Sequence, residues 1–142
     1  MKRKASAQWQ GGLKDGKGTI SSQSGVLKET QYSFSTRFED GIGTNPEELI
    51  AAAHAGCFTM ALSGQLTTAG LTPESLETTA AVKLEKTDKG FTITAIHLTT
   101  HAKVPGATAT AFDTAVQNAK NGCPISRLFH GNTEITVDAQ LA

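Results

Sequence analysis

The chain has two cysteines in 142 residues, Cys57 in a long apolar segment and Cys123 at a Gly-Cys-Pro corner. A thiolate can act as a nucleophile, a leaving group or a metal ligand. The alternative for Cys57 is a small core hydrophobe, because free cysteine is among the most buried residue types. The presence of a second cysteine in a different local setting favours a chemical role for both.

Cys123 is predicted to be a helix N-cap. Gly122 is typical of the residue that ends one helix, and Pro124 suits the first position of the next. The positive end of a helix dipole lowers the pKa of a thiol there and eases its reaction. The alternative is a structural disulfide to Cys57 across 65 intervening residues, worth about 4 kcal/mol on a loop-entropy estimate.

The N-terminal residues favour a cytoplasmic protein. They are basic but are not followed by the apolar region of a secretory signal. In a reducing compartment a persistent structural disulfide is rare, whereas a transient catalytic one is the usual exception.

The helix that carries Cys57 has clear start and stop signals. Asn45 is a suitable cap, Pro46 suits the first helical position, and Glu47 adds negative charge to the first turn. We expect this helix to run from Asn45 to about Ala69 and to stop at Gly70. It is apolar almost all round, so it needs cover on every side, whereas a single six-stranded sheet covers only one. An obligate homodimer with these helices packed together at its centre provides that cover.

The remaining elements predict a single α+β domain over residues 1–142, of order βββ-α-ββ-α-α-β. A hairpin is expected around Asp88-Lys89-Gly90. Strands are expected at residues 5–9, 18–22, 31–38, 77–86, 91–102 and 133–141, and further helices at 110–121 and 124–129.

Composition excludes some functional classes. The 13 basic and 13 acidic residues balance, so no net field draws the chain to nucleic acid or to an anionic membrane. His, Gly, Ser or Gln interrupts every apolar run before it reaches membrane-spanning length. We therefore expect neither nucleic acid nor a membrane as a partner.

Four segments together resemble the osmotically inducible protein C (OsmC) family, which includes the organic hydroperoxide resistance proteins. The resemblance runs nearly end to end. It implies an OsmC-like fold, an intertwined homodimer and a cysteine-based peroxidase that reduces organic hydroperoxides in oxidative and osmotic stress defence. The segments are Thr-Arg-Phe-Glu at 36–39, Gly-Thr-Asn-Pro-Glu-Glu-Leu at 43–49, Ala-Ala-His-Ala-Gly-Cys-Phe-Thr-Met-Ala-Leu at 52–62 and Gly-Cys-Pro-Ile-Ser at 122–126.

By position, Cys57 resembles the peroxidatic cysteine of that family and Cys123 the resolving one. Arg37 and Glu47 resemble its charged pair at the sulfur, although taken alone they also suit a solvated loop cation and a first-turn helix charge. An unperturbed thiol is only about 3% ionised at pH 7, and a nearby guanidinium lowers a pKa by about 1–3 units. Glu47 would hold the guanidinium by a bidentate contact and could exchange a proton with the departing alkoxide.

The spacing of Glu47 and Cys57 adds a constraint. Glu47 precedes Cys57 by ten positions, which is about 15 Å along a straight helix. Because one side chain cannot span that distance, Glu47 would serve the Cys57 of the partner subunit.

Other polar residues are weaker candidates. His54 resembles the OsmC branch of the family, and a metal shared with Cys57 would lack a third ligand. Ser126 has no paired base at useful spacing. We therefore expect no metal and no other cofactor.

The expected reaction is that of a thiol-dependent hydroperoxide reductase. The Cys57 thiolate attacks the terminal peroxide oxygen, an alcohol departs, and the sulfenic acid condenses with Cys123 to a disulfide. An external dithiol, with a lipoyl-type dithiol as one candidate, then reduces that disulfide. The residues expected to favour an organic substrate are Phe38, Phe58, Met60 and Phe129.

Two other functional classes stay open on the sequence. One is a non-catalytic, stress-induced dimer whose cysteines are core residues. The other is a thiol–disulfide oxidoreductase acting on proteins, which the absence of a Cys-x-x-Cys motif disfavours.

Overall fold

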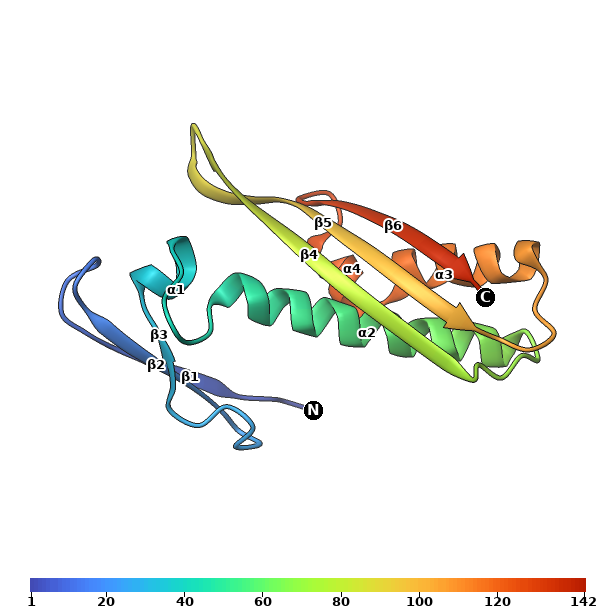
Figure 1. Cartoon of the computed structure of the whole chain (residues 1–142), viewed down its shortest axis with the longest axis horizontal. Helices are drawn as coiled ribbons and strands as arrows, with labels where there is room; N and C mark the ends of the chain where they lie inside the picture. The colour runs from blue at the N-terminus through green and yellow to red at the C-terminus, as the bar shows by residue number, and fades with distance from the viewer. The chain divides into compact units, whose positions relative to one another are not determined.

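The computed structural model describes residues 1–142, in two compact units, Met1–Leu49 and Ile50–Ala142. The chain is α+β, as expected, but its strands form two separate three-stranded sheets, β1-β2-β3 and β4-β5-β6, instead of one six-stranded sheet (Figure 1). The elements are β1 Ala5–Gln10, β2 Lys17–Ser22, β3 Thr30–Tyr32, α1 Phe34–Phe38, α2 Pro46–Thr68, β4 Ser75–Thr87, β5 Gly90–Lys103, α3 Ala109–Gly122, α4 Pro124–Phe129 and β6 Glu134–Leu141.

The N-terminal unit is an antiparallel sheet followed by the short helix α1. The sequence prediction of a strand over residues 31–38 is wrong beyond Tyr32. Ser33 and Thr36 form a reciprocal capping box, in which each side-chain oxygen accepts the backbone N–H of the other residue. This local pairing satisfies the first free N–H groups and starts a helix where propensity alone favours a strand.

The long helix α2 begins and ends where the sequence predicts. The Asn45 Oδ1 atom accepts the backbone N–H of Glu48 at 2.7 Å. At the other end Gly70 has a positive φ of 78°, and the N–H groups of Gly70 and Leu71 bond to the carbonyls of Thr67 and Leu66. This pair of bonds is the Schellman ending that a left-handed glycine permits.

By length and composition alone, α2 is long and apolar enough to span a membrane, although the sequence predicts an apolar run too interrupted for this. Core helices of water-soluble proteins have the same two properties. Phe58, Leu62 and Leu66 on one face of α2 have no exposed surface. Full burial of each such side chain stabilises the fold by about 1.5–3 kcal/mol.

In the C-terminal unit the helices pack on one face of the sheet β4-β5-β6 (Figure 1). The hairpin between β4 and β5 turns at Asp88 and Lys89, just before Gly90, as predicted, and β6 pairs with β5 in parallel. The core joins α2, the inner face of β5 and α3. Its largest apolar members are Phe58, Leu62, Leu66, Ile96, Leu98 and Phe112.

The junction between α3 and α4 differs in detail from the prediction. Gly122 belongs to the last turn of α3 and has no positive φ, so it is not a left-handed cap. Cys123 instead ends α3 and caps α4, where its sulfur accepts the backbone N–H of Ser126 at 3.3 Å. The predicted N-cap role of Cys123 is therefore confirmed.

Candidate functional site

The two cysteines, distant in the sequence, meet within the C-terminal unit. The Cys57 sulfur, on α2, lies close enough to the Cys123 thiol and to the backbone N–H of Ile125 for both to shift its pKa. Both thiols are free, Cys57 half-buried and Cys123 buried. Two adjacent thiols of unequal exposure can pass between a dithiol and a disulfide state.

The surroundings of Cys57 in this unit favour the neutral thiol. Burial is the main cause that raises its pKa above the ordinary value, and the Cys123 thiol raises it further. The backbone N–H of Ile125 acts in the opposite direction but does not outweigh these effects. A thiolate at Cys57 therefore needs a positive charge that these neighbours do not supply.

A buried pair of polar side chains lies next to Cys123. The Nε2 atom of His54, on α2, is 2.8 Å from the hydroxyl oxygen of Ser126, on α4. The Cys123 thiol donates to the same oxygen at 3.2 Å. The sequence prediction that Ser126 has no paired base is thus wrong, because the pairing crosses 72 positions and leaves no local spacing signal.

His54 is fully buried, and its Nδ1 atom has no hydrogen-bond partner. Burial lowers its pKa, so the ring is neutral near pH 7. The only sequence signal for the His54–Ser126 pairing is a histidine within an apolar run, because a buried histidine requires a polar partner.

Arg37 and Glu47 form an ion pair inside the N-terminal unit. The Arg37 Nε and Nη2 atoms lie 2.9 and 2.8 Å from the same carboxylate oxygen, Glu47 Oε1. The predicted bidentate contact is therefore wrong, because both nitrogens use a single oxygen of Glu47. Glu47 Oε2 is buried and unpartnered, so it can still accept a hydrogen bond.

The four aromatic and apolar residues expected near a substrate have different surroundings. Phe38 lies beside the Arg37 guanidinium, with 5.3 Å between its ring centroid and the guanidinium carbon, and it lines a cavity of about 300 Å³. Phe129 is half-buried against His54. Met60 is 80% exposed, whereas Phe58 has no exposed surface and packs in the core. Phe58 therefore supplies packing in this unit, not an accessible contact surface.

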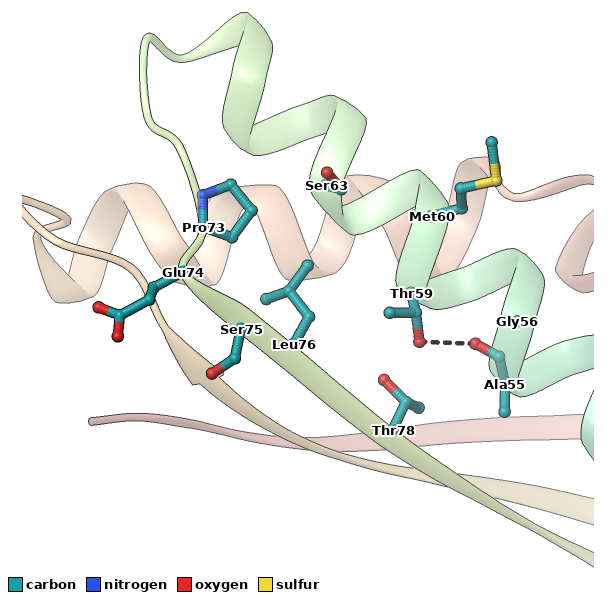
Figure 2. Close-up of a pocket in the computed structure, with 10 residues that line it drawn as sticks. All are labelled: Ala55, Gly56, Thr59, Met60, Ser63, Pro73, Glu74, Ser75, Leu76 and Thr78. Carbon is teal, nitrogen blue, oxygen red and sulfur yellow. Dashed lines mark hydrogen bonds between the residues drawn. The ribbon is translucent and has the colours of Figure 1, made fainter.

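A groove of about 540 Å³ lies between α2 and β4 in the C-terminal unit. Figure 2 shows Leu76 and Thr78 on the β4 side and Thr59 on the α2 side, with Thr59 bonded back to its own helix at Ala55. The groove continues onto the exposed, small-residue face of α2. No group of three possible metal ligands is found in the structure.

Comparison with known proteins agrees with this arrangement. The sequence pattern described as "OsmC-like protein" matches residues 39–138. Peroxiredoxin OsmC of Escherichia coli (strain K12) is 55% identical over 139 residues, which are 98% of this chain and 96% of the relative. The organic hydroperoxide resistance protein OhrA of Bacillus subtilis (strain 168) is 34% identical over 97 residues, covering 67% of this chain and 66% of the relative.

A solved structure gives the same fold at low sequence identity. The OsmC-like protein of Mycoplasma pneumoniae superposes with a TM-score of 0.79 at 16% identity, covering 100% of this chain and 98% of its own. At that identity the likeness concerns the fold alone. The family pattern matches most of the chain, and two relatives are more than 30% identical to it. The chain therefore belongs to the OsmC family.

Proposed function

We propose that this chain is a thiol peroxidase that reduces organic hydroperoxides to alcohols, with Cys57 as the peroxidatic cysteine and Cys123 as the resolving one. The observation that carries the proposal is the proximity of the two free thiols in one core cluster. The names of its relatives, a peroxiredoxin and an organic hydroperoxide resistance protein, support the same activity.

The chemistry divides between the two sulfurs. The half-buried Cys57 attacks the terminal oxygen of the hydroperoxide, the O–O bond breaks, and the alcohol leaves. The resulting sulfenic acid then condenses with the adjacent Cys123 thiol, releasing water. The buried position of Cys123 protects it from direct oxidation and suits the second role.

Arg37 is the cation that this chemistry requires. Because burial and Cys123 raise the pKa of Cys57, the thiolate needs a positive charge from outside the C-terminal unit. Glu47 holds the guanidinium through Oε1, and its free Oε2 can accept a proton or a hydrogen bond from the reacting peroxide.

The active protein is a homodimer in which Arg37 and Glu47 of one subunit serve Cys57 of the other. Glu47 and Cys57 lie ten positions apart on the continuous helix α2, which is about 15 Å of helix. The uncovered face of α2 also supports a second copy as its cover. The exposed residues of this face are Ala52, Ala53, Gly56, Met60, Gly64 and Thr67.

An organic group suits the cavity beside Arg37. The cavity of about 300 Å³ is lined by aromatic side chains together with the guanidinium. A hydroperoxide could direct its polar end to Arg37 and its alkyl or aryl part to the rings. Its aromatic lining residues are Trp9, Tyr32, Phe34 and Phe38.

The proposed setting is the cytoplasm, where an external dithiol regenerates the two thiols. Side-by-side turnover of cumene hydroperoxide, tert-butyl hydroperoxide and hydrogen peroxide, each with lipoyl and monothiol reductants, tests the proposal. We expect the organic peroxides and the lipoyl dithiol to give the highest kcat/KM. Turnover of none of the three peroxides would overturn it.

A further inference from the structure

A chain of hydrogen bonds leads from Cys123 into the interior of the C-terminal unit. It runs from the Cys123 sulfur to the Ser126 hydroxyl, at 3.2 Å, and on to His54 Nε2, at 2.8 Å. The three residues are at most 3% exposed. A buried polar chain of this kind is costly unless its members are satisfied, so its place behind a reactive thiol calls for an explanation.

The direction of the bonds suits proton removal from Cys123. Its thiol donates to the Ser126 oxygen, and the single proton of that hydroxyl is then available to His54 Nε2. Because burial lowers the pKa of His54, the ring is neutral and its Nε2 lone pair can accept.

We propose that Ser126 and His54 take up the proton of Cys123 when this thiol attacks the sulfenic acid on Cys57. The inference rests on the peroxidase function proposed above. Ser126 touches the reacting sulfur and acts as a catalytic residue, whereas His54 acts through Ser126 and is a positioning residue that holds the proton.

The step balances without a further reagent. The thiol proton passes to Ser126 as the hydroxyl proton passes to His54. The sulfur of Cys123 supplies an electron pair to a new S–S bond and is oxidised. The S–O bond of the Cys57 sulfenic acid breaks, its sulfur is reduced, and hydroxide leaves. Return of the proton through Ser126 converts the hydroxide to water and His54 to its neutral form.

The burial of the His54 ring explains why the proton is held only briefly. In the tautomer whose Nε2 accepts, the ring already carries its hydrogen on the unpartnered Nδ1. Protonation at Nε2 therefore places a positive charge on a ring whose charged form burial disfavours. The imidazolium is therefore stable only while the Cys123 thiolate balances its charge, and it gives the proton back when the disulfide forms.

Ser126 also lines a polar cavity of about 240 Å³, which has room for several water molecules. Titratable groups face the cluster from three sides: Cys57 from α2, Lys120 from α3 and His130 after α4. The buried residues of β5 are not titratable: they are Ile96, Leu98, Thr100 and Ala102. Ser126 thus connects the resolving cysteine to a polar cavity with room for water, through which the proton can also exchange.

Single-turnover kinetics separates this step from peroxide cleavage. Reduced protein is mixed with one equivalent of cumene hydroperoxide between about pH 5.5 and 8.5. Loss of peroxide reports the first step, and loss of dimedone-trappable sulfenic acid at Cys57 reports the second. In the parent protein we expect a second step nearly independent of pH. In Ser126→Ala and in His54→Gln the rate of the second step should fall about 100-fold near pH 6, relative to the rate of the first step.

The variants should also change the shape of the pH profile. Without the relay only preformed Cys123 thiolate reacts, so their second step should accelerate about tenfold per pH unit. Thr100→Val is the matched control, because it removes another fully buried, hydrogen-bonded hydroxyl of this unit. It should keep the parent profile.

Two outcomes would overturn the relay. One is an unchanged second step in Ser126→Ala and His54→Gln. The other is slowing by the same factor at every pH, which a loss of packing would give. If the parent protein consumes no peroxide in the first step, the peroxidase proposal itself fails, and that result is distinct from both.

Discussion

Two nitrogens of Arg37 converge on a single oxygen of Glu47, within 2.9 Å, and leave the other carboxylate oxygen buried without a partner. This one-sided contact fixes the guanidinium while keeping an acceptor free. The pair is 40% and 11% exposed, so the arginine can reach a neighbour while the carboxylate anchors it. Such an arrangement suits a site completed by another group.

Arg37→Ala should raise the pKa of Cys57. The thiolate would lose its nearby positive charge, while burial and Cys123 would still favour the thiol. The midpoint of iodoacetamide alkylation, followed against pH, should move upward by about 1 unit or more. The same shift is not expected for Arg3→Ala, and an unchanged midpoint in Arg37→Ala would assign the cation to another residue.

Replacing each cysteine by serine should separate the two oxidation steps. Cys57→Ser should abolish peroxide consumption, because the attacking sulfur is gone. Cys123→Ser should consume one equivalent and leave a trappable sulfenic acid at Cys57, because serine can still cap α4 but cannot form a disulfide. Mass spectrometry after dimedone treatment measures both results, and equal peroxide consumption in Cys57→Ser and the parent would contradict the assignment.

Local signals in the sequence predict most of the fold. Asn45 and Gly70 delimit α2, Gly90 marks the hairpin, and Pro124 marks α4, because each residue type favours one backbone geometry. The prediction failed at 33–38, where a side-chain capping box outweighed strand propensity. It also could not reveal that the six strands divide into two sheets, which depends on long-range pairing.

The site was predictable only in part. The rarity and settings of Cys57 and Cys123 predict a reactive pair, and the structure places the two thiols near each other. The His54–Ser126 bond was missed because no rule on neighbouring residues links positions so far apart. The sequence likewise could not predict that Arg37 contacts a single oxygen of Glu47, because this depends on how the N-terminal unit orients Arg37.

Phe58 and Phe38 should respond differently to truncation. Phe58→Ala should lower the free energy of unfolding by about 3–5 kcal/mol, because it opens a cavity in the core. Phe38→Ala should instead reduce the kcat/KM ratio of cumene hydroperoxide to hydrogen peroxide, since Phe38 lines the cavity beside Arg37. Denaturant unfolding and steady-state kinetics measure the two effects. An unaltered ratio in Phe38→Ala would exclude this cavity as the substrate site.

Met60→Lys should weaken the dimer. Met60 is 80% exposed on the uncovered face of α2, and a lysine there would bring two charges into a helix–helix interface. Sedimentation velocity should detect a shift from dimer to monomer at micromolar concentration. Val26→Lys, which changes another exposed apolar residue, should leave the assembly unaltered. A monomeric parent protein, or a Met60→Lys dimer as stable as the parent, would contradict the proposed interface.

A mixed dimer tests whether the site is shared between subunits. In a heterodimer of one Cys57→Ser subunit and one Glu47→Ala subunit, one composite site lacks both groups and the other retains both. Because Arg37 pairs with Glu47 inside one chain, the intact site also keeps its cation. The heterodimer, purified through two different affinity tags, should have about half the parent activity, although both mutant homodimers are impaired. Sites contained within single subunits would give a heterodimer no more active than the Glu47→Ala homodimer, and that result would rule out the shared site.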